Sequence, residues 1–136
     1  MIENKLSIPI NNELDIVIAR QKGREMAKEI GFAAIDLALI ATAISELTRN
    51  IITYAEKGNI ILQYIENQGK KGIEVISKDN GPGIESIELA LQDGYSTTNS
   101  LGVGLPGVRR LMDDFEILSE LGKGTTVIAR KWINWL

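Results

Sequence analysis

The chain has 136 residues, 44% hydrophobic and 24% charged, which is typical of one folded domain spanning residues 1–136 and argues against a disordered or fibrous protein. Cysteine and histidine are both missing, which excludes disulfides, Cys/His zinc sites, thiol nucleophiles and histidine acid–base chemistry. A net charge of -3 with 5% aromatic residues does not favour nucleic-acid binding, and we expect a cytoplasmic protein with no membrane segment.

The first third of the chain predicts a strand followed by two helices. Residues 5–10 form the strand candidate, Asn11 and Asn12 offer a helix cap, and residues 14–30 fit a helix. A second helix is predicted over about residues 35–54. In both helices apolar or small residues recur at alternating spacings of three and four, which indicates a buried stripe on each: Ile16, Ala19, Gly23, Met26 and Ile30, then Leu37, Ile40, Ile44, Leu47 and Ile51.

The remainder of the chain predicts two antiparallel hairpins with a helical segment between them. The hairpin strands are residues 60–66 with 73–77, and residues 115–121 with 125–132. Between the hairpins we expect a break at residues 79–83, a short helix over 85–92, a polar loop over 93–100 and a helix from Pro106 to about residue 114. This order predicts an α+β fold, a two-layer α/β sandwich whose mixed, mostly antiparallel sheet carries the helices on one face.

Glu46 and Asn50 lie four residues apart on the second predicted helix, so both side chains emerge on the same side, next to the apolar stripe. An amide oxygen there can ligate Mg²⁺ bound to phosphates, and the carboxylate can accept the proton of an attacking hydroxyl. The alternative is a pair of ordinary polar residues on a solvated helix edge. The spacing alone leaves both interpretations open.

Asp79 ends a predicted strand and is followed by Gly81 and Gly83. An aspartate there can accept a hydrogen bond from an exocyclic amine such as that of adenine, and glycines allow the backbone to approach a flat ligand closely. The alternative is a plain turn, since Asn-Gly-Pro-Gly is typical turn sequence. In the last hairpin Gly124 and Thr125 also indicate a turn, although Thr125 could place a hydroxyl in a pocket.

The segment over residues 101–107 places Gly102 and Gly104 before a predicted helix, whose free N–H groups and dipole favour a bound phosphate. Its glycine spacing also fits a dinucleotide-binding fingerprint. We reject that interpretation because a polar segment precedes it, Pro106 lies within it and no parallel β-α-β unit surrounds it. Without histidine, the catalytic triplet of eukaryotic-type protein kinases is also excluded.

Taken in order, these four segments resemble the N, G1, G2 and G3 boxes of the GHKL (Bergerat-fold) ATP-binding family. The matching boxes are residues 46–50, 79–83, 102–105 and 124–125. The small size, together with residues 43–50, 79–84, 94–98 and 101–113, is similar to the compact serine/threonine switch kinases associated with the bacterial stressosome. Asn99 and Ser100, and the apolar tail over 131–136, depart from that pattern.

The resemblance implies that the chain binds ATP with Mg²⁺ and transfers phosphate to a protein hydroxyl. Glu46 would be the catalytic base, Asn50 the Mg²⁺ ligand, and residues 93–101 a lid over the nucleotide. Arg49 would contact the γ-phosphate or, as we prefer, a partner protein. The residues that would bind the nucleotide are Asn50, Asp79, Gly81, Gly83, Gly102, Val103, Gly104, Leu105 and Thr125.

The same resemblance implies protein partners. The leading hypothesis is a partner-switching kinase that phosphorylates STAS-domain proteins and then activates a PP2C-type phosphatase in a sigma-factor stress pathway. The alternative is a nucleotide-gated anti-sigma factor or phosphatase-activating module with little transfer activity. A free ATPase of the chaperone or topoisomerase type, and a scaffold that binds no nucleotide, are weaker hypotheses.

Overall fold

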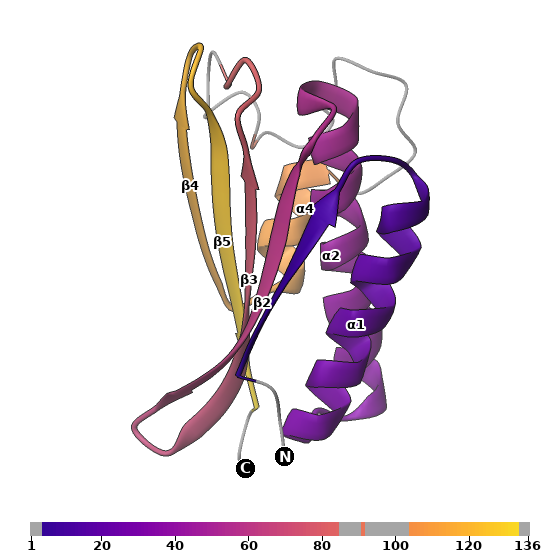
Figure 1. Cartoon of the computed structure of the whole chain (residues 1–136). Coiled ribbons are helices and arrows are strands. Elements are labelled where there is room, and N and C mark those ends of the chain that lie inside the picture. Colours follow the sequence, from indigo (N-terminus) through magenta and orange to yellow (C-terminus); the bar gives the residue numbers. More distant parts are fainter. Residues whose placement is uncertain (1–3, 85–90, 92–103, 134–136) are drawn as a thin grey trace.

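The computed structural model describes residues 4–84, 91 and 104–133, and all structural statements below refer to these residues. The elements occur in the order β1 (Lys5–Ile10), α1 (Leu14–Ile30), α2 (Ala34–Ala55), β2 (Gly58–Asn67), β3 (Lys70–Asp79), α4 (Gly104–Leu111), β4 (Asp114–Glu120) and β5 (Gly124–Trp132). The described strands form one layer and the described helices lie on one face of it (Figure 1). The predicted two-layer α+β sandwich is therefore confirmed.

The sheet has the strand order β1-β2-β3-β5-β4, and each of its four pairings in the described residues is antiparallel. The pairing of β3 with β5 joins the two hairpins, which are far apart in the sequence. In that register Asp79 is opposite Thr125, and on the other side of β3 Asp79 is opposite Gly58. One end of the sheet therefore collects three strand termini.

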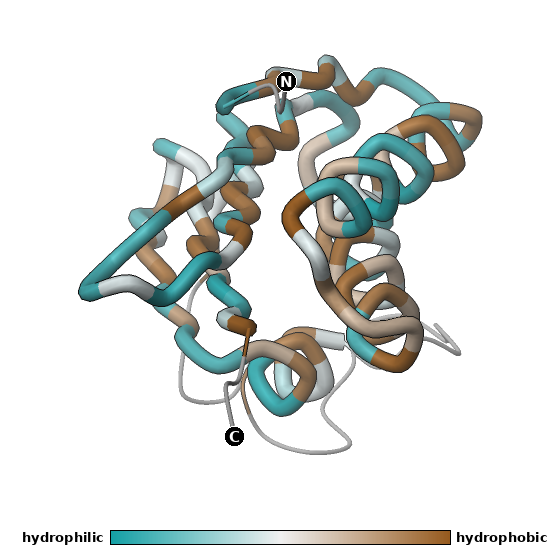
Figure 2. Tube along the Cα trace, turned by 90° about the horizontal axis from the view of Figure 1, so that it is seen from below, coloured by the Kyte–Doolittle hydropathy of each residue, from teal (hydrophilic) through white to brown (hydrophobic). Residues whose placement is uncertain are grey.

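The core lies between the sheet and the helices. Ile40, Ile44, Leu47 and Ile51 of the predicted α2 stripe are almost completely buried, and they pack with the buried side chains of the central strands. Hydrophobic residues recur along each helix in Figure 2, where helices and strands are seen as separate layers from below. None of the described helices has the combination of length and hydrophobicity that crossing a bilayer requires.

Three local predictions need correction. The α1 stripe is buried from Ala19 to Ile30, but Ile16 at its start is only half-buried. The first hairpin turns more tightly than expected, because Gln68 and Gly69 both have positive φ, as in the two-residue turns that match strand twist. Helix α4 begins two residues before Pro106 and ends before residue 114, because the N–H of Asp113 already donates to a carbonyl oxygen of β5.

The expected cap of α1 is present in a modified form. Glu13, the residue that immediately precedes the helix, makes no side-chain capping bond. Instead the side-chain oxygen of Asn12 accepts a hydrogen bond from the N–H of Leu14 at 3.0 Å, while Asp15 accepts from the N–H groups of Asn11 and Asn12. The predicted helix over 85–92 and the loop over 93–100 lie outside the described residues, apart from residue 91.

Replacing Gly124 with alanine should destabilise the fold far more than the same change at Gly122. Both glycines have positive φ, so each substitution costs about 1 kcal/mol in backbone strain. A Cβ at Gly124 would also overlap the carbonyl oxygen of Asp79, whereas nothing lies within 4 Å of a Cβ at Gly122. Urea unfolding should show Gly124→Ala to be less stable than Gly122→Ala by about 2 kcal/mol. Equal losses would mean that this close strand contact carries no energetic weight.

Candidate functional site

Glu46 is buried on α2, with 5% of its surface exposed. Helix α4 packs against α2, and the N–H of its first residue, Gly104, contacts the Glu46 carboxylate. The interpretation of Glu46 as a residue on a solvated helix edge is therefore wrong. Asn50, four residues later, is half-buried and makes no side-chain hydrogen bond to any described residue. Its amide remains available for a ligand.

Both oxygens of the Glu46 carboxylate have a donor. Oε1 forms an ion pair with the guanidinium of Arg49, one helical turn further along α2. Oε2 accepts a hydrogen bond of 3.3 Å from the N–H of Gly104, the first residue of α4. Glu46 and Gly104 are 58 residues apart in the sequence. Their contact brings the box at residues 46–50 to the start of α4, where the sequence predicts phosphate binding.

Asp79 organises the opposite end of the site. Its Oδ1 accepts hydrogen bonds from the N–H of Gly81 at 2.9 Å and from the N–H of Thr125 at 3.2 Å. Its Oδ2 has no partner among the described residues, and no unpartnered side-chain oxygen or nitrogen is buried there, so this oxygen reaches the surface. One carboxylate oxygen thus bonds to two backbone N–H groups, while the other is free to accept a hydrogen bond from a ligand.

The glycines after Asp79 allow close contacts within the protein. A Cβ on Gly81 would lie 2.6 Å from the Cβ of Ala55 at the end of α2, and a Cβ on Gly83 would overlap the carbonyl oxygen of Glu120. Gly83 also has a positive φ of 81°. The loop therefore packs directly on α2 and on the last hairpin, which accounts for both glycines through contacts made by the chain itself.

Ser119 is a site residue that sequence reasoning missed. Its hydroxyl accepts a hydrogen bond from the N–H of Ile84 at 2.7 Å, donates to the carbonyl oxygen of Gly124 and lies 2.8 Å from the hydroxyl of Thr125. It ties the loop after Asp79 to the last hairpin. Strand alternation places Ser119 on the same face as Phe115 and Ile117, so a polar residue at an expected core position was the available signal.

The two ends of the site are connected by α2. Glu46 marks one end and Ala55, which contacts Gly81, marks the other, about 13 Å away along the helix axis. Asn50 lies between them. Leu105 is half-buried against the core beside Gly104. Gly102, Val103 and the expected lid over 93–101 lie outside the described residues.

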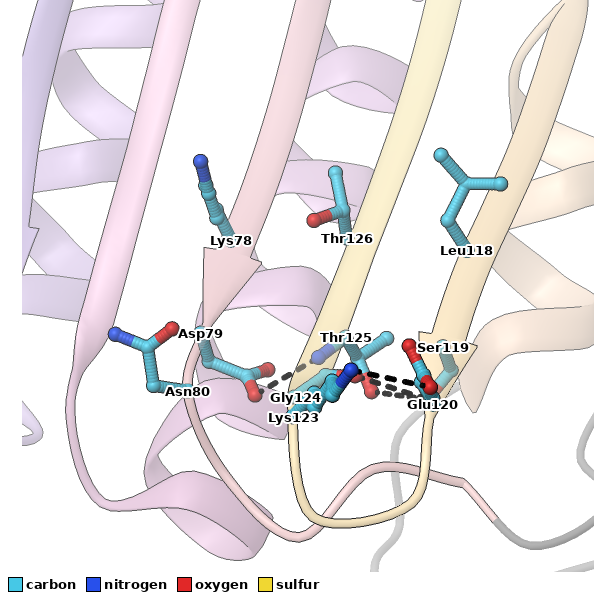
Figure 3. Close-up of a pocket in the computed structure, with 10 residues that line it drawn as sticks. All are labelled: Lys78, Asp79, Asn80, Leu118, Ser119, Glu120, Lys123, Gly124, Thr125 and Thr126. Carbon is cyan, nitrogen blue, oxygen red and sulfur yellow. Dashed lines mark hydrogen bonds and ion pairs between the residues drawn. The ribbon is translucent and has the colours of Figure 1, made fainter.

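A hollow of about 380 Å³ lies at the sheet end beside Asp79 and Thr125. Figure 3 shows that Lys78, Thr126 and Leu118 line it from the sheet face opposite the helices, and that Asp79, Thr125 and Ser119 lie at its lower rim. Glu46, Asn50 and Gly104 do not line it. The hollow therefore covers only the Asp79 end of the site. We define the whole site by the hydrogen bonds of Glu46 and Asp79 described above.

The described residues fit a magnesium ion that is held mainly by phosphates. They contain no cluster of three or more acidic, histidine or cysteine side chains, so they form no complete metal cage. Mg²⁺ usually keeps several waters and takes only one or two protein ligands together with substrate phosphates. The amide oxygen of Asn50, which has no hydrogen-bond partner among the described residues and lies one helical turn from Glu46, is a ligand of that kind.

The chain is similar in sequence to several known proteins. The model of the family described as "histidine kinase-like ATPase domain" matches residues 10–131. The chain is 52% identical over 127 residues to the serine/threonine-protein kinase RsbT of Bacillus subtilis (strain 168), which covers 93% of this chain and 96% of that protein. It is 34% identical over 106 residues to an anti-sigma F factor of Clostridium kluyveri, which covers 74% of each.

The fold is also shared with a solved structure. The crystal structure of the RsbU and RsbW domains of a Mycobacterium tuberculosis protein superposes with a TM-score of 0.63. The match covers 95% of this chain and 32% of that chain, at 22% sequence identity, and so concerns the fold alone. The family model and the alignment with RsbT confirm the resemblance noted in the sequence, and the chain belongs to the histidine kinase-like ATPase family.

Proposed function

We propose that residues 1–136 form a single ATP-binding domain that acts as a protein serine/threonine kinase and partner switch. The observation that carries this proposal is the contact of Glu46 with Gly104, which places a carboxylate at the helix start where phosphates would bind. The 52% identity to a kinase, over 96% of that protein, supports it. A base beside a phosphate site suits transfer to a hydroxyl.

At the nucleotide's base end, Asp79 would accept a hydrogen bond from the adenine amine through its free Oδ2. Thr125, whose N–H already donates to Asp79, would present its hydroxyl beside the base. Gly81 and Gly83 would line the pocket through their backbone. Ser119 holds the Thr125 hydroxyl at 2.8 Å, so we add it as a positioning residue for this end.

At the phosphate end, the backbone N–H groups of Gly102, Val103, Gly104 and Leu105 would donate to the phosphates. Asn50 would hold Mg²⁺ through its amide oxygen, and the bound ion supplies charge neutralisation on the phosphates. The roles of Gly102 and Val103 rest on the sequence resemblance. The two ends of the site lie about 13 Å apart along α2, so the nucleotide would lie along this helix with its base at Asp79 and its phosphates at Gly104.

In the transfer step Glu46 would accept the proton of a serine or threonine hydroxyl on the partner protein. The hydroxyl oxygen then bonds to the γ-phosphorus as the bond to the bridging oxygen breaks, and ADP leaves with that electron pair. The chain's residues position the groups and stabilise charge. No covalent enzyme intermediate is required, which agrees with a sequence without histidine or cysteine.

We further propose that the partners are STAS-domain proteins as substrates and a PP2C-type phosphatase as the activated target, within the cytoplasm. Relatives named anti-sigma F factor, at 34% identity, support the alternative of a nucleotide-gated binding module. Both functions would use the same nucleotide site. Only the fate of the γ-phosphate separates them.

Replacing Asp79 with asparagine should abolish ATP binding without unfolding the chain. Asparagine can keep an oxygen toward the N–H groups of Gly81 and Thr125, but it then turns an amide nitrogen toward the adenine amine. Titration calorimetry should show a loss in ATP affinity of at least about a hundredfold. Asp36→Asn, in the first turn of α2, removes the same charge elsewhere and serves as the control. Normal affinity in Asp79→Asn would remove Asp79 from the base pocket.

Replacing Glu46 with glutamine should retain ATP binding and reduce phosphoryl transfer by about a hundredfold or more. Glutamine can accept only a weaker, uncharged hydrogen bond from Gly104, and it cannot take a proton from the attacking hydroxyl. The measurement is the single-turnover rate of label transfer from γ-labelled ATP to a partner protein. Undiminished transfer would show that Glu46 has no part in the chemistry.

The two proposed functions predict different fates for labelled phosphate. Incubation of the wild-type chain with γ-labelled ATP and candidate STAS-domain proteins should label a serine or threonine that mass spectrometry can locate. A stable, nucleotide-dependent complex with no labelled residue would favour the binding module instead.

A further inference from the structure

The donors that hold Glu46 are also donors that suit a phosphate. The carboxylate takes the N–H at the start of α4 and the guanidinium of Arg49, a combination that binds carboxylate and phosphate oxygens alike. Arg49 retains 41% exposure of its side chain, whereas the Glu46 side chain has 7%. The arginine can therefore turn outward, while the carboxylate depends on partners within the protein.

Within the described residues of α4, few N–H donors lie near the start of the helix. The first residues of a helix have N–H groups without intrahelical partners, and the third residue of α4 is Pro106, which has no N–H. Gly104 and Leu105 are left as the donors of the first three positions. Glu46 already engages one of these two N–H groups at 3.3 Å.

From these contacts we propose that Glu46 is an internal competitor of the nucleotide's phosphates. A phosphate oxygen that takes the Gly104 N–H displaces Oε2, and Arg49 can turn toward the same phosphate. The carboxylate is then released toward the attacking hydroxyl. Nucleotide binding would thus release the Glu46 carboxylate, the catalytic base of the transfer step. This inference rests on the proposed ATP site and adds a coupling between its occupancy and the base.

The competition has a thermodynamic consequence that can be measured without turnover. If Glu46 and a phosphate exclude each other from Gly104, weakening the Glu46 contact must strengthen nucleotide binding by the same coupling free energy. This increase in affinity depends on the phosphates of the ligand alone. Adenosine, which lacks phosphates, should gain nothing.

The test measures the binding of ATP–Mg²⁺ and of adenosine by titration calorimetry. It compares the wild-type chain with Glu46→Gln and Asp36→Asn. If adenosine binds too weakly for direct titration, its affinity is measured by its displacement of ATP. Glutamine removes the negative charge that competes, so ATP affinity should rise at least about fivefold, with adenosine affinity unchanged. Asp36 lies ten residues away on the same helix, about 15 Å along its axis, and its variant should match the wild type for both ligands.

Unchanged or weaker ATP binding by Glu46→Gln would overturn the competition, as would an equal gain for adenosine. Glu46→Asp provides a second reading if the glutamine variant folds poorly, because its shorter side chain keeps the charge but withdraws from Gly104. It should also bind ATP more tightly than the wild type. A wild-type chain that binds no ATP at all would instead refute the proposed function itself.

Discussion

The buried stripe of α2 is the constraint on which the rest of this molecule depends. Ile40, Ile44, Leu47 and Ile51 are covered by the sheet and by neighbouring helices, which fixes the rotation of α2 about its axis. Because helical side chains keep constant angular offsets, fixing the stripe also fixes Glu46 and Asn50 at the seam beside it. The candidate chemistry is thus positioned by hydrophobic packing that takes no part in it.

The burial of Glu46 means that its carboxylate needs partners within the protein. A carboxylate removed from water must be paired or hydrogen-bonded, and here a cation and a backbone N–H meet that requirement. Both donors also suit phosphate oxygens, so the stability of the free chain and the affinity for a nucleotide draw on the same groups. Arg49, which we expected to contact a phosphate or a partner protein, is in this structure the counter-ion of the proposed base.

Antiparallel pairing brings the other half of the site together. Asp79 ends β3 and Thr125 begins β5, and their register leaves one carboxylate oxygen bonded to the backbone and the other accessible. Gly81, Gly83 and Gly124 are required there because a side chain would overlap Ala55, Glu120 or Asp79. The glycines that indicate ligand binding in the sequence are explained first by the close packing of three chain segments.

Periodicity and turn residues in the sequence were sufficient to predict the main helices and strands of the described chain and the α+β sandwich, because these depend on local spacing. The four boxes were identified by their resemblance to a known family. The burial of Glu46, its contact with Gly104 and the role of Ser119 depend on packing between segments 58 and 35 residues apart. No local pattern encodes which of two faces a neighbouring helix will cover. Only the tertiary structure decided that Glu46, a residue beside the α2 stripe, is buried. There its carboxylate must accept a hydrogen bond from the N-terminus of α4.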